Sequence, residues 1–82
     1  MEDEKESMKE LLEILRTLRP DIDFEHETAL VDKALIDSFD IVRIVGECND
    51  VFDIEIDVDD LLPENFNSAA AMWELIQTLM NE

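Results

Sequence analysis

Three stretches of the chain show helical periodicity, at about Glu4 to Leu18, Ser38 to Val51 and Ser68 to Met80. In each stretch, apolar residues recur every three or four positions, which places them on one face of a helix. These positions are Met8, Leu11, Leu12, Leu15 and Leu18; Ile41, Val42, Ile44, Val45, Cys48, Val51 and Phe52; and Ala69, Met72, Trp73, Ile76, Leu79 and Met80. The pattern predicts three amphipathic helices.

Residues near the ends of these stretches suit helix termini. Ser7 and Glu10 match a capping box, although the acidic residues before them also suit a first turn. Pro20 ends the first helix, because the residue before a proline is biased away from the helical conformation. Either Asp37 or Ser38 is a good N-cap for the second helix.

The segments between the helices lack helical periodicity. Residues 21–37 form a long polar stretch with scattered apolar residues, and loops of this length are often functional. Residues 53–59 alternate like a strand but have no partner strand, so we interpret them as an extended connection whose Ile54, Ile56 and Val58 face the core. Residues 60–65 are expected to hold a short helical turn, either before Pro63 or just after it. We therefore expect one all-α domain over residues 1–82, a small up-and-down bundle of three main helices plus one short helix.

The charge balance narrows the possible partners. The chain has 23 acidic and 6 basic residues, a net charge of −17. This excludes binding to a nucleic-acid backbone and disfavours an anionic membrane surface, since both require basic residues. It favours partners with basic patches, and the strong like charge favours a monomer.

Other features point to a cytoplasmic protein. The single cysteine, Cys48, lies on the apolar face of the second helix, which predicts a buried structural thiol in a chain that lacks an internal disulfide partner. The acidic start differs from the basic start of a signal peptide, and no apolar run is long enough to span a membrane.

Catalytic and metal-binding patterns are weak. Ser38 has no base near it in the sequence, and the only histidine, His26, is typical of an exposed loop residue. Five acidic residues match EF-hand loop positions, but Val58 stands where that loop needs glycine, so we predict no metal site. Met72 and Trp73 are interpreted as core residues.

The surroundings of Ser38 indicate a possible functional role, because this residue follows a long loop and begins an apolar helix in a small acidic chain. Three blocks, 35–42 (LIDSFDIV), 52–56 (FDIEI) and 63–68 (PENFNS), resemble the acyl carrier protein family, including peptidyl and D-alanyl carriers. The resemblance spans nearly the whole chain.

The resemblance implies a carrier that catalyses nothing itself. Ser38 would carry 4′-phosphopantetheine, transferred from coenzyme A by a phosphopantetheinyl transferase that recognises Asp37. The thiol of this arm would hold an acyl or aminoacyl group as a thioester, loaded by a ligase and presented to downstream synthases. A phosphodiester at Ser38 would lie near unpaired N–H groups at the helix start.

The same resemblance implies a docking surface on the second helix. The expected contact residues are Asp37, Phe39, Asp40, Val42 and Arg43, and a hydrophobic cargo is expected to enter near Val45, Ile56, Phe66 and Ala70. Some residues depart from the family pattern. Phe39 replaces the usual leucine or methionine, Leu35 replaces a frequent glycine, and Arg43 and Asn49 replace acidic residues. These departures favour a specialised bacterial carrier over a housekeeping fatty-acid carrier. The competing hypothesis is an acidic helical interaction module that is never modified.

Overall fold

The chain folds into a small bundle of helices. The computed structural model describes residues 4–81, with side chains from Met8 onward. In chain order the elements are helix α1 (Glu4–Leu18), helix α2 (Ser38–Phe52), 3₁₀ helix η1 (Val58–Asp60), helix α3 (Pro63–Phe66) and helix α4 (Ala69–Met80). Within residues 4–81 there is no strand. The predicted all-α bundle of three main helices and one short helix is confirmed.

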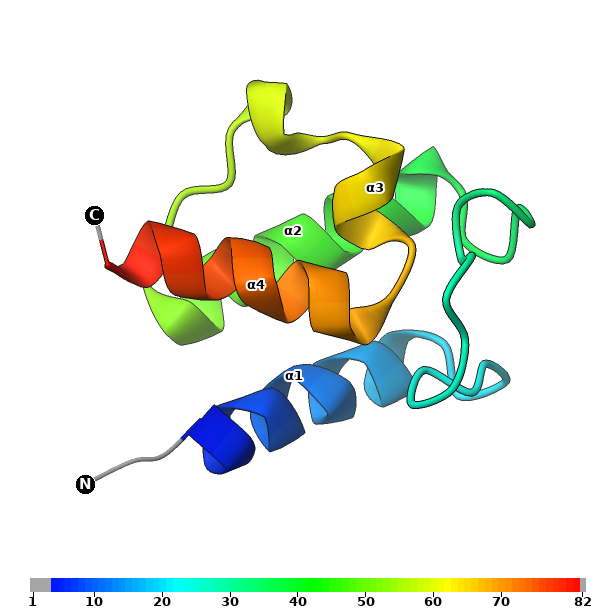
Figure 1. Ribbon diagram of the computed structural model, residues 1–82, viewed down its shortest axis with the longest axis horizontal. Helices are drawn as coiled ribbons and strands as arrows, with labels where there is room; N and C mark the ends of the chain where they lie inside the picture. The colour runs from blue at the N-terminus through cyan, green and yellow to red at the C-terminus, as the bar shows by residue number, and fades with distance from the viewer. Residues whose placement is uncertain (1–3, 82) are drawn as a thin grey trace.

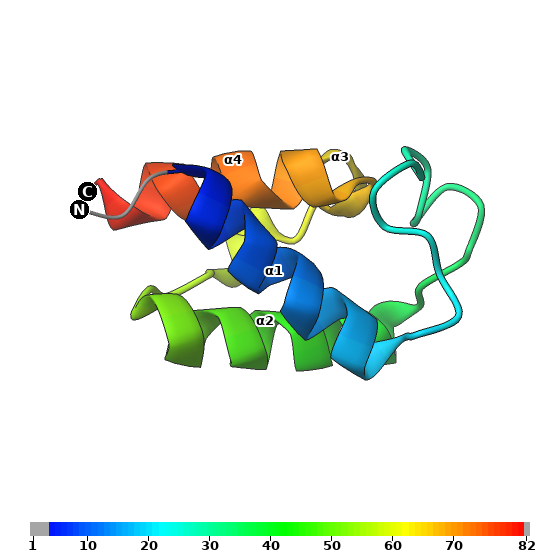
Figure 2. The same ribbon diagram turned by 90° about the horizontal axis from the view of Figure 1, so that it is seen from below.

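The three long helices pack against one another (Figures 1 and 2). Helix α1 runs opposite to α2, whereas α2 and α4 run in the same direction (Figure 1). The reason is the connection 53–68, which includes η1 and α3 and carries the chain back along the bundle before α4 begins. The radius of gyration, 11.7 Å, is close to the value of about 12 Å expected for a compact chain of this length.

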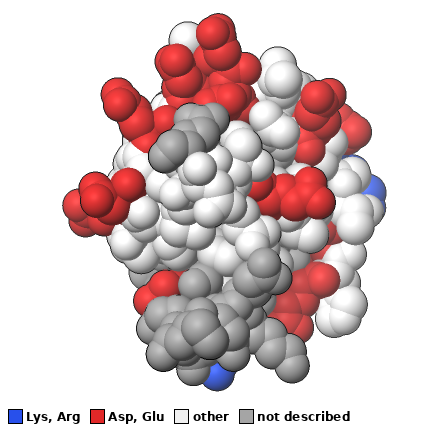
Figure 3. Space-filling view, turned by 60° about the vertical axis from the view of Figure 1, so that its left-hand side comes forward, with Lys and Arg blue, Asp and Glu red and all other residues white. Residues whose placement is uncertain are grey.

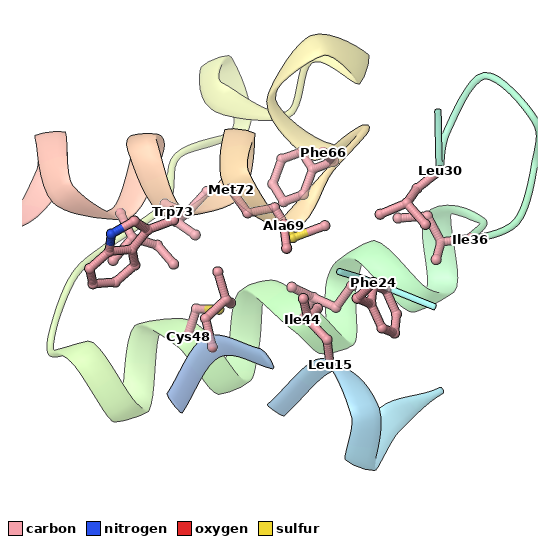
Figure 4. Packing of buried hydrophobic residues seen from close by; sticks show 13 residues of the cluster. Leu15, Phe24, Leu30, Ile36, Ile44, Cys48, Phe66, Ala69, Met72 and Trp73 are labelled. Carbon is pink, nitrogen blue, oxygen red and sulfur yellow. The ribbon is translucent and has the colours of Figure 1, made fainter. Parts of the chain in front are cut away.

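The core lies between these helices and is closed at one end by the loop between α1 and α2 (Figure 4). Its buried side chains are Leu11 and Leu15 of α1; Ile44 and Cys48 of α2; Phe66 of α3; Ala69, Met72, Trp73 and Ile76 of α4; and Phe24, Leu30, Ile36 and Ile56 of the connecting segments. The ring of Trp73 packs against that of Phe52, with centroids 5.7 Å apart. The apolar residues scattered through 21–37 therefore tie this long loop to the core.

Of the two alternatives for the start of the first helix, the structure has the earlier one, because α1 includes residues from Glu4 onward and Ser7 lies inside it. One local expectation was wrong. In the connection 53–59, Ile56 is buried and Ile54 half-buried as expected, but Val58 is 74% exposed. The strand-like alternation stops at Val58 because this residue begins η1, which is capped by the Asp57 side chain.

Candidate functional site

Ser38 is the first residue of α2, and the structure decides which residue caps this helix. Asp37 has extended backbone angles, and its carboxylate accepts a hydrogen bond from the amide of Asp40 (2.9 Å). In return, the Asp40 carboxylate accepts one from the amide of Asp37 (3.2 Å), which completes a capping box. Because Asp37 is the N-cap, the Ser38 hydroxyl is not needed to start the helix.

The Ser38 side chain is exposed, and its hydroxyl makes no hydrogen bond to any described residue. An enzyme can therefore reach the oxygen without breaking an existing interaction. The expectation of unpaired amides at this helix start holds only in part. The amide of Asp40 is taken by the Asp37 side chain at 2.9 Å, and that of Asp37 by the Asp40 side chain at 3.2 Å.

The capping box also affects the electrostatics of the site. The hydrogen bond from the Asp40 amide, supported by nearby groups, lowers the pKa of Asp37 below its ordinary value. Asp37 is therefore ionised at neutral pH.

The turn before Ser38 forms without glycine. Ala34 adopts the left-handed conformation, with φ 58°, in a position where L-residues other than glycine are strained. The amides of Leu35 and Ile36 both donate to the carbonyl of Leu30, at 2.8 and 3.3 Å. Buried Ile36 then fixes the chain just ahead of the Asp37–Ser38 pair.

Asn67, between α3 and α4, anchors the same loop from outside. Its backbone carbonyl accepts from the amide of Leu30 (2.9 Å), and its Oδ1 accepts from the amides of Val31 (2.9 Å) and Asp32 (3.1 Å). Its Nδ2 donates to the Asp32 carboxylate at 3.3 Å. The loop that leads to Ser38 is thus attached to the connection between α3 and α4.

Arg19 links the end of α1 to the start of α2. Its Nη1 donates to the Asp40 carboxylate (2.7 Å) and to the carbonyl of Leu35 (3.1 Å). Its Nε and Nη2 bind the Asp21 carboxylate at 3.1 and 2.9 Å. The hydrogen bonds to Asp21, with the charges of Asp21 and Asp40, raise the pKa of Arg19, and the same contact lowers the pKa of Asp21.

The expected docking residues on α2 fall into two groups. Phe39 and Val42 are 72% and 64% exposed, and Asp37 and Arg43 are also exposed. Asp40 differs, because it is only 8% exposed and its carboxylate is occupied by Arg19 and the Asp37 amide. The structure therefore places Asp40 beneath the surface, where it supports the helix start, while the other four residues face solvent.

The other candidate groups are placed as the sequence suggested. His26 is exposed, and its Nδ1 hydrogen-bonds the Asp23 carboxylate (2.8 Å), which raises the pKa of His26. Its partner is Asp23 and not Ser38, so these residues form no catalytic triad. Cys48 is buried, and burial raises the pKa of its thiol to about 12, which keeps it protonated at neutral pH.

The residues expected around a cargo differ in how deeply they are buried. Ile56 and Phe66 are buried, Val45 is half-buried and Ala70 is exposed. Ala70 lines a cavity of about 180 Å³ between α1, the following loop and the start of α4. A second cavity of about 160 Å³ involves Ile14, Thr17, Leu18 and Glu47. The route of a cargo stays a prediction.

The surface matches the charge of the sequence. On the face drawn in Figure 3, acidic side chains surround a largely uncharged centre, and basic side chains appear only at its margin. Among the side chains that the structure describes, those of residues 8–81, no three His, Cys, Asp or Glu groups converge in a way that suits a metal ion. None of the helices in this part of the chain combines the length and apolar character that crossing a membrane requires.

Comparisons of this chain with models of protein families, with curated proteins and with solved structures give no match. The function is therefore inferred from the residues and their geometry.

Proposed function

We propose that this protein is a carrier of the acyl carrier protein type, which holds acyl or aminoacyl groups as thioesters on a 4′-phosphopantetheine arm attached to Ser38. The observation that carries the proposal is that Ser38 is accessible and its hydroxyl unbonded. Ser38 is an exposed residue at the first position of a 15-residue helix, and its hydroxyl makes no hydrogen bond to a described residue. The acidic helical bundle around it, and the resemblance of the three sequence blocks, support the same function.

The attachment chemistry needs only an accessible hydroxyl on this chain. A phosphopantetheinyl transferase would join Ser38 Oγ to the phosphorus of the phosphopantetheine half of coenzyme A. The phosphoanhydride bond would break, adenosine 3′,5′-bisphosphate would leave, and the hydroxyl proton would pass to a base of the transferase. The arm supplies a thiol with long reach, which buried Cys48 does not offer.

The surface around Ser38 fits partners that approach with basic groups around an apolar recess. Phe39 and Val42 provide exposed apolar contacts, and the net charge of −17 attracts basic patches with fast association. We assign this surface to the transferase, to a loading ligase and to downstream synthases. We further propose that the protein is a monomer with a single domain, that it lies in the cytoplasm, and that it catalyses no reaction itself.

The decisive experiment is an intact-mass measurement after incubation with coenzyme A and a phosphopantetheinyl transferase of broad specificity. The wild-type protein should gain one phosphopantetheine group, and Ser38→Ala should gain none. Ser68→Ala is a matched control, because Ser68 also stands at a helix start but its Oγ accepts the Ala71 amide at 3.0 Å. This variant should be modified like the wild type. An unchanged wild-type mass, with a control carrier modified in parallel, would refute the proposal.

A second candidate function is an acidic interaction module that is never modified. The exposure of Phe39 and Val42 favours it, because both side chains offer a docking surface that does not depend on Ser38. This module predicts an unchanged mass together with partner binding that survives Ser38→Ala and is lost in a Phe39→Ser, Val42→Ser double variant.

A further inference from the structure

The side chain of Arg19 binds the chain on both sides of Ser38, at Leu35 and at Asp40. We refer to the segment 35–40 as the turn. Nη1 of Arg19 donates to the carbonyl of Leu35, three positions before Ser38, and to the carboxylate of Asp40, two positions after it. The residues on either side of the hydroxyl are thus bound to one nitrogen at the end of α1. Nothing in the capping box alone provides this cross-link, because the box joins only Asp37 and Asp40.

The environment of Asp40 makes this contact important. A carboxylate with 8% exposure needs a charged partner, since an unpaired buried charge is strongly unfavourable. Arg43 lies farther away, with its Nη1 3.9 Å from Asp40 Oδ1, whereas Arg19 binds Oδ2 at 2.7 Å. Without Arg19, Asp40 would be drawn toward solvent and would leave the amide of Asp37. The strained Ala34 next to Leu35 adds a further reason for the turn to relax.

We propose that Arg19 is a positioning residue for the modification of Ser38, because it fixes Leu35 and Asp40 and thereby holds the turn on which the hydroxyl is presented. This inference rests on the proposed carrier function. Arg19 does not touch the reacting atoms. Its effect passes through the backbone of Leu35 and the side chain of Asp40.

The geometry favours an arginine over a lysine. Nε and Nη2 form a two-bond contact with Asp21, which orients the guanidinium so that Nη1 faces Leu35 and Asp40. A lysine ammonium carries the same charge but lacks this planar fork. Arg16, one turn earlier on α1, provides a matched comparison. It pairs with Glu25 on the exposed surface and makes no hydrogen bond or ion pair with residues 35–40.

The test compares the rate of Ser38 modification in Arg19→Gln and Arg16→Gln, which undergo the same chemical change. With purified transferase and coenzyme A, we expect kcat/KM for Arg19→Gln to fall about tenfold or more, because small displacements of a reacting group are costly in rate. Arg16→Gln should stay within about twofold, as expected for an exposed ion pair. Arg19→Lys should lie between wild type and Arg19→Gln.

Loss of stability alone must be separated from loss of positioning. Ile76→Val removes a methylene group from the core at α4, away from the turn, and should lower the melting temperature without lowering kcat/KM at temperatures where the protein is folded. Amide hydrogen exchange provides a second readout. In Arg19→Gln, the amides of residues 37–41 should exchange faster relative to the middle of α4. If Arg19→Gln does not fold, Arg19→Lys decides the question by the same two measurements.

A double-mutant cycle with Asp40→Asn tests whether Arg19 acts on Ser38 modification through Asp40. Arg19→Gln should slow modification much less in the Asp40→Asn background, because the partner of the guanidinium is already changed. Fully additive effects would contradict a route through Asp40. If the wild type is modified but Arg19→Gln is modified equally fast, the positioning role is refuted while the carrier function stands. If the wild type is never modified, both are refuted.

Discussion

The clearest stability prediction concerns Asn67→Ala, which releases the loop that leads to Ser38. The Asn67 side chain accepts two hydrogen bonds, from the amides of Val31 (2.9 Å) and Asp32 (3.1 Å), across 36 and 35 positions of the chain. Each such bond contributes about 1 kcal/mol to the free energy of unfolding. Removing both should lower the stability by about 2 kcal/mol, which corresponds to a fall in melting temperature of about 10 °C.

The measurement is urea unfolding followed by the fluorescence of Trp73, the single tryptophan, which is buried in the core. Asn65→Ala is the matched control. Its side chain makes one hydrogen bond, from Nδ2 to the carbonyl of Asp60 (2.8 Å), within a single connection. This variant should lose about 1 kcal/mol, with the slope against urea unchanged for both variants.

A second substitution separates hydrogen bonding from charge. Asn67→Asp keeps both acceptors but places a carboxylate next to that of Asp32, so its destabilisation should shrink as salt is added. The reasoning is refuted if Asn67→Ala unfolds at the urea concentration of the wild type, or if Asn65→Ala is the more damaging change.

Four further predictions follow from other contacts. Cys48, whose pKa is raised to about 12 by burial, should react with a thiol reagent at pH 8 far more slowly in the native protein than in urea, and equal rates would contradict its burial. Ser68→Ala should lower stability by about 1 kcal/mol, whereas Thr78→Ala on the same helix should change it by less than about 0.5 kcal/mol, because Ser68 caps α4 and the exposed Thr78 hydroxyl only returns to the Glu74 carbonyl. The lowered folded-state pKa of Asp37 means that its stabilising contribution is complete above its unfolded pKa of about 3.9 and is lost as the pH falls through the folded value. The melting temperature of Asp37→Ala should therefore differ most from that of the wild type at neutral pH and least at pH 2. Finally, added NaCl should raise the melting temperature of the wild type, because a net charge of −17 repels itself, and an unmoved transition would show that this repulsion is unimportant.

The elements of the fold were largely predictable because their signals are local. The spacing of apolar residues predicted helices at about 4–18, 38–51 and 68–80, and the structure has Glu4–Leu18, Ser38–Phe52 and Ala69–Met80. The place of Cys48 in the core followed from the same spacing. Position 38 could be recognised as a helix start from the residues beside it.

The long-range contacts that hold the candidate site in place could not be predicted from local patterns. Arg19 and Asp40 are 21 positions apart, and no periodicity connects the end of one helix with the start of the next. Asp40, expected at the surface, is buried and bound by Arg19. The choice of Asp37 over Ser38 as the N-cap depended on the extended backbone angles of Asp37, which the sequence pattern does not reveal.

By itself, the sequence determined where the helices form and which of their faces are apolar, because neighbours three and four positions apart decide both. Tertiary packing alone decided that the loop 21–37 is fastened to the core and to Asn67, that the chain returns along 53–68 before α4, and that Val58 faces solvent. These outcomes depend on surfaces brought together from distant parts of the chain, where each contact forms only after the helices have packed.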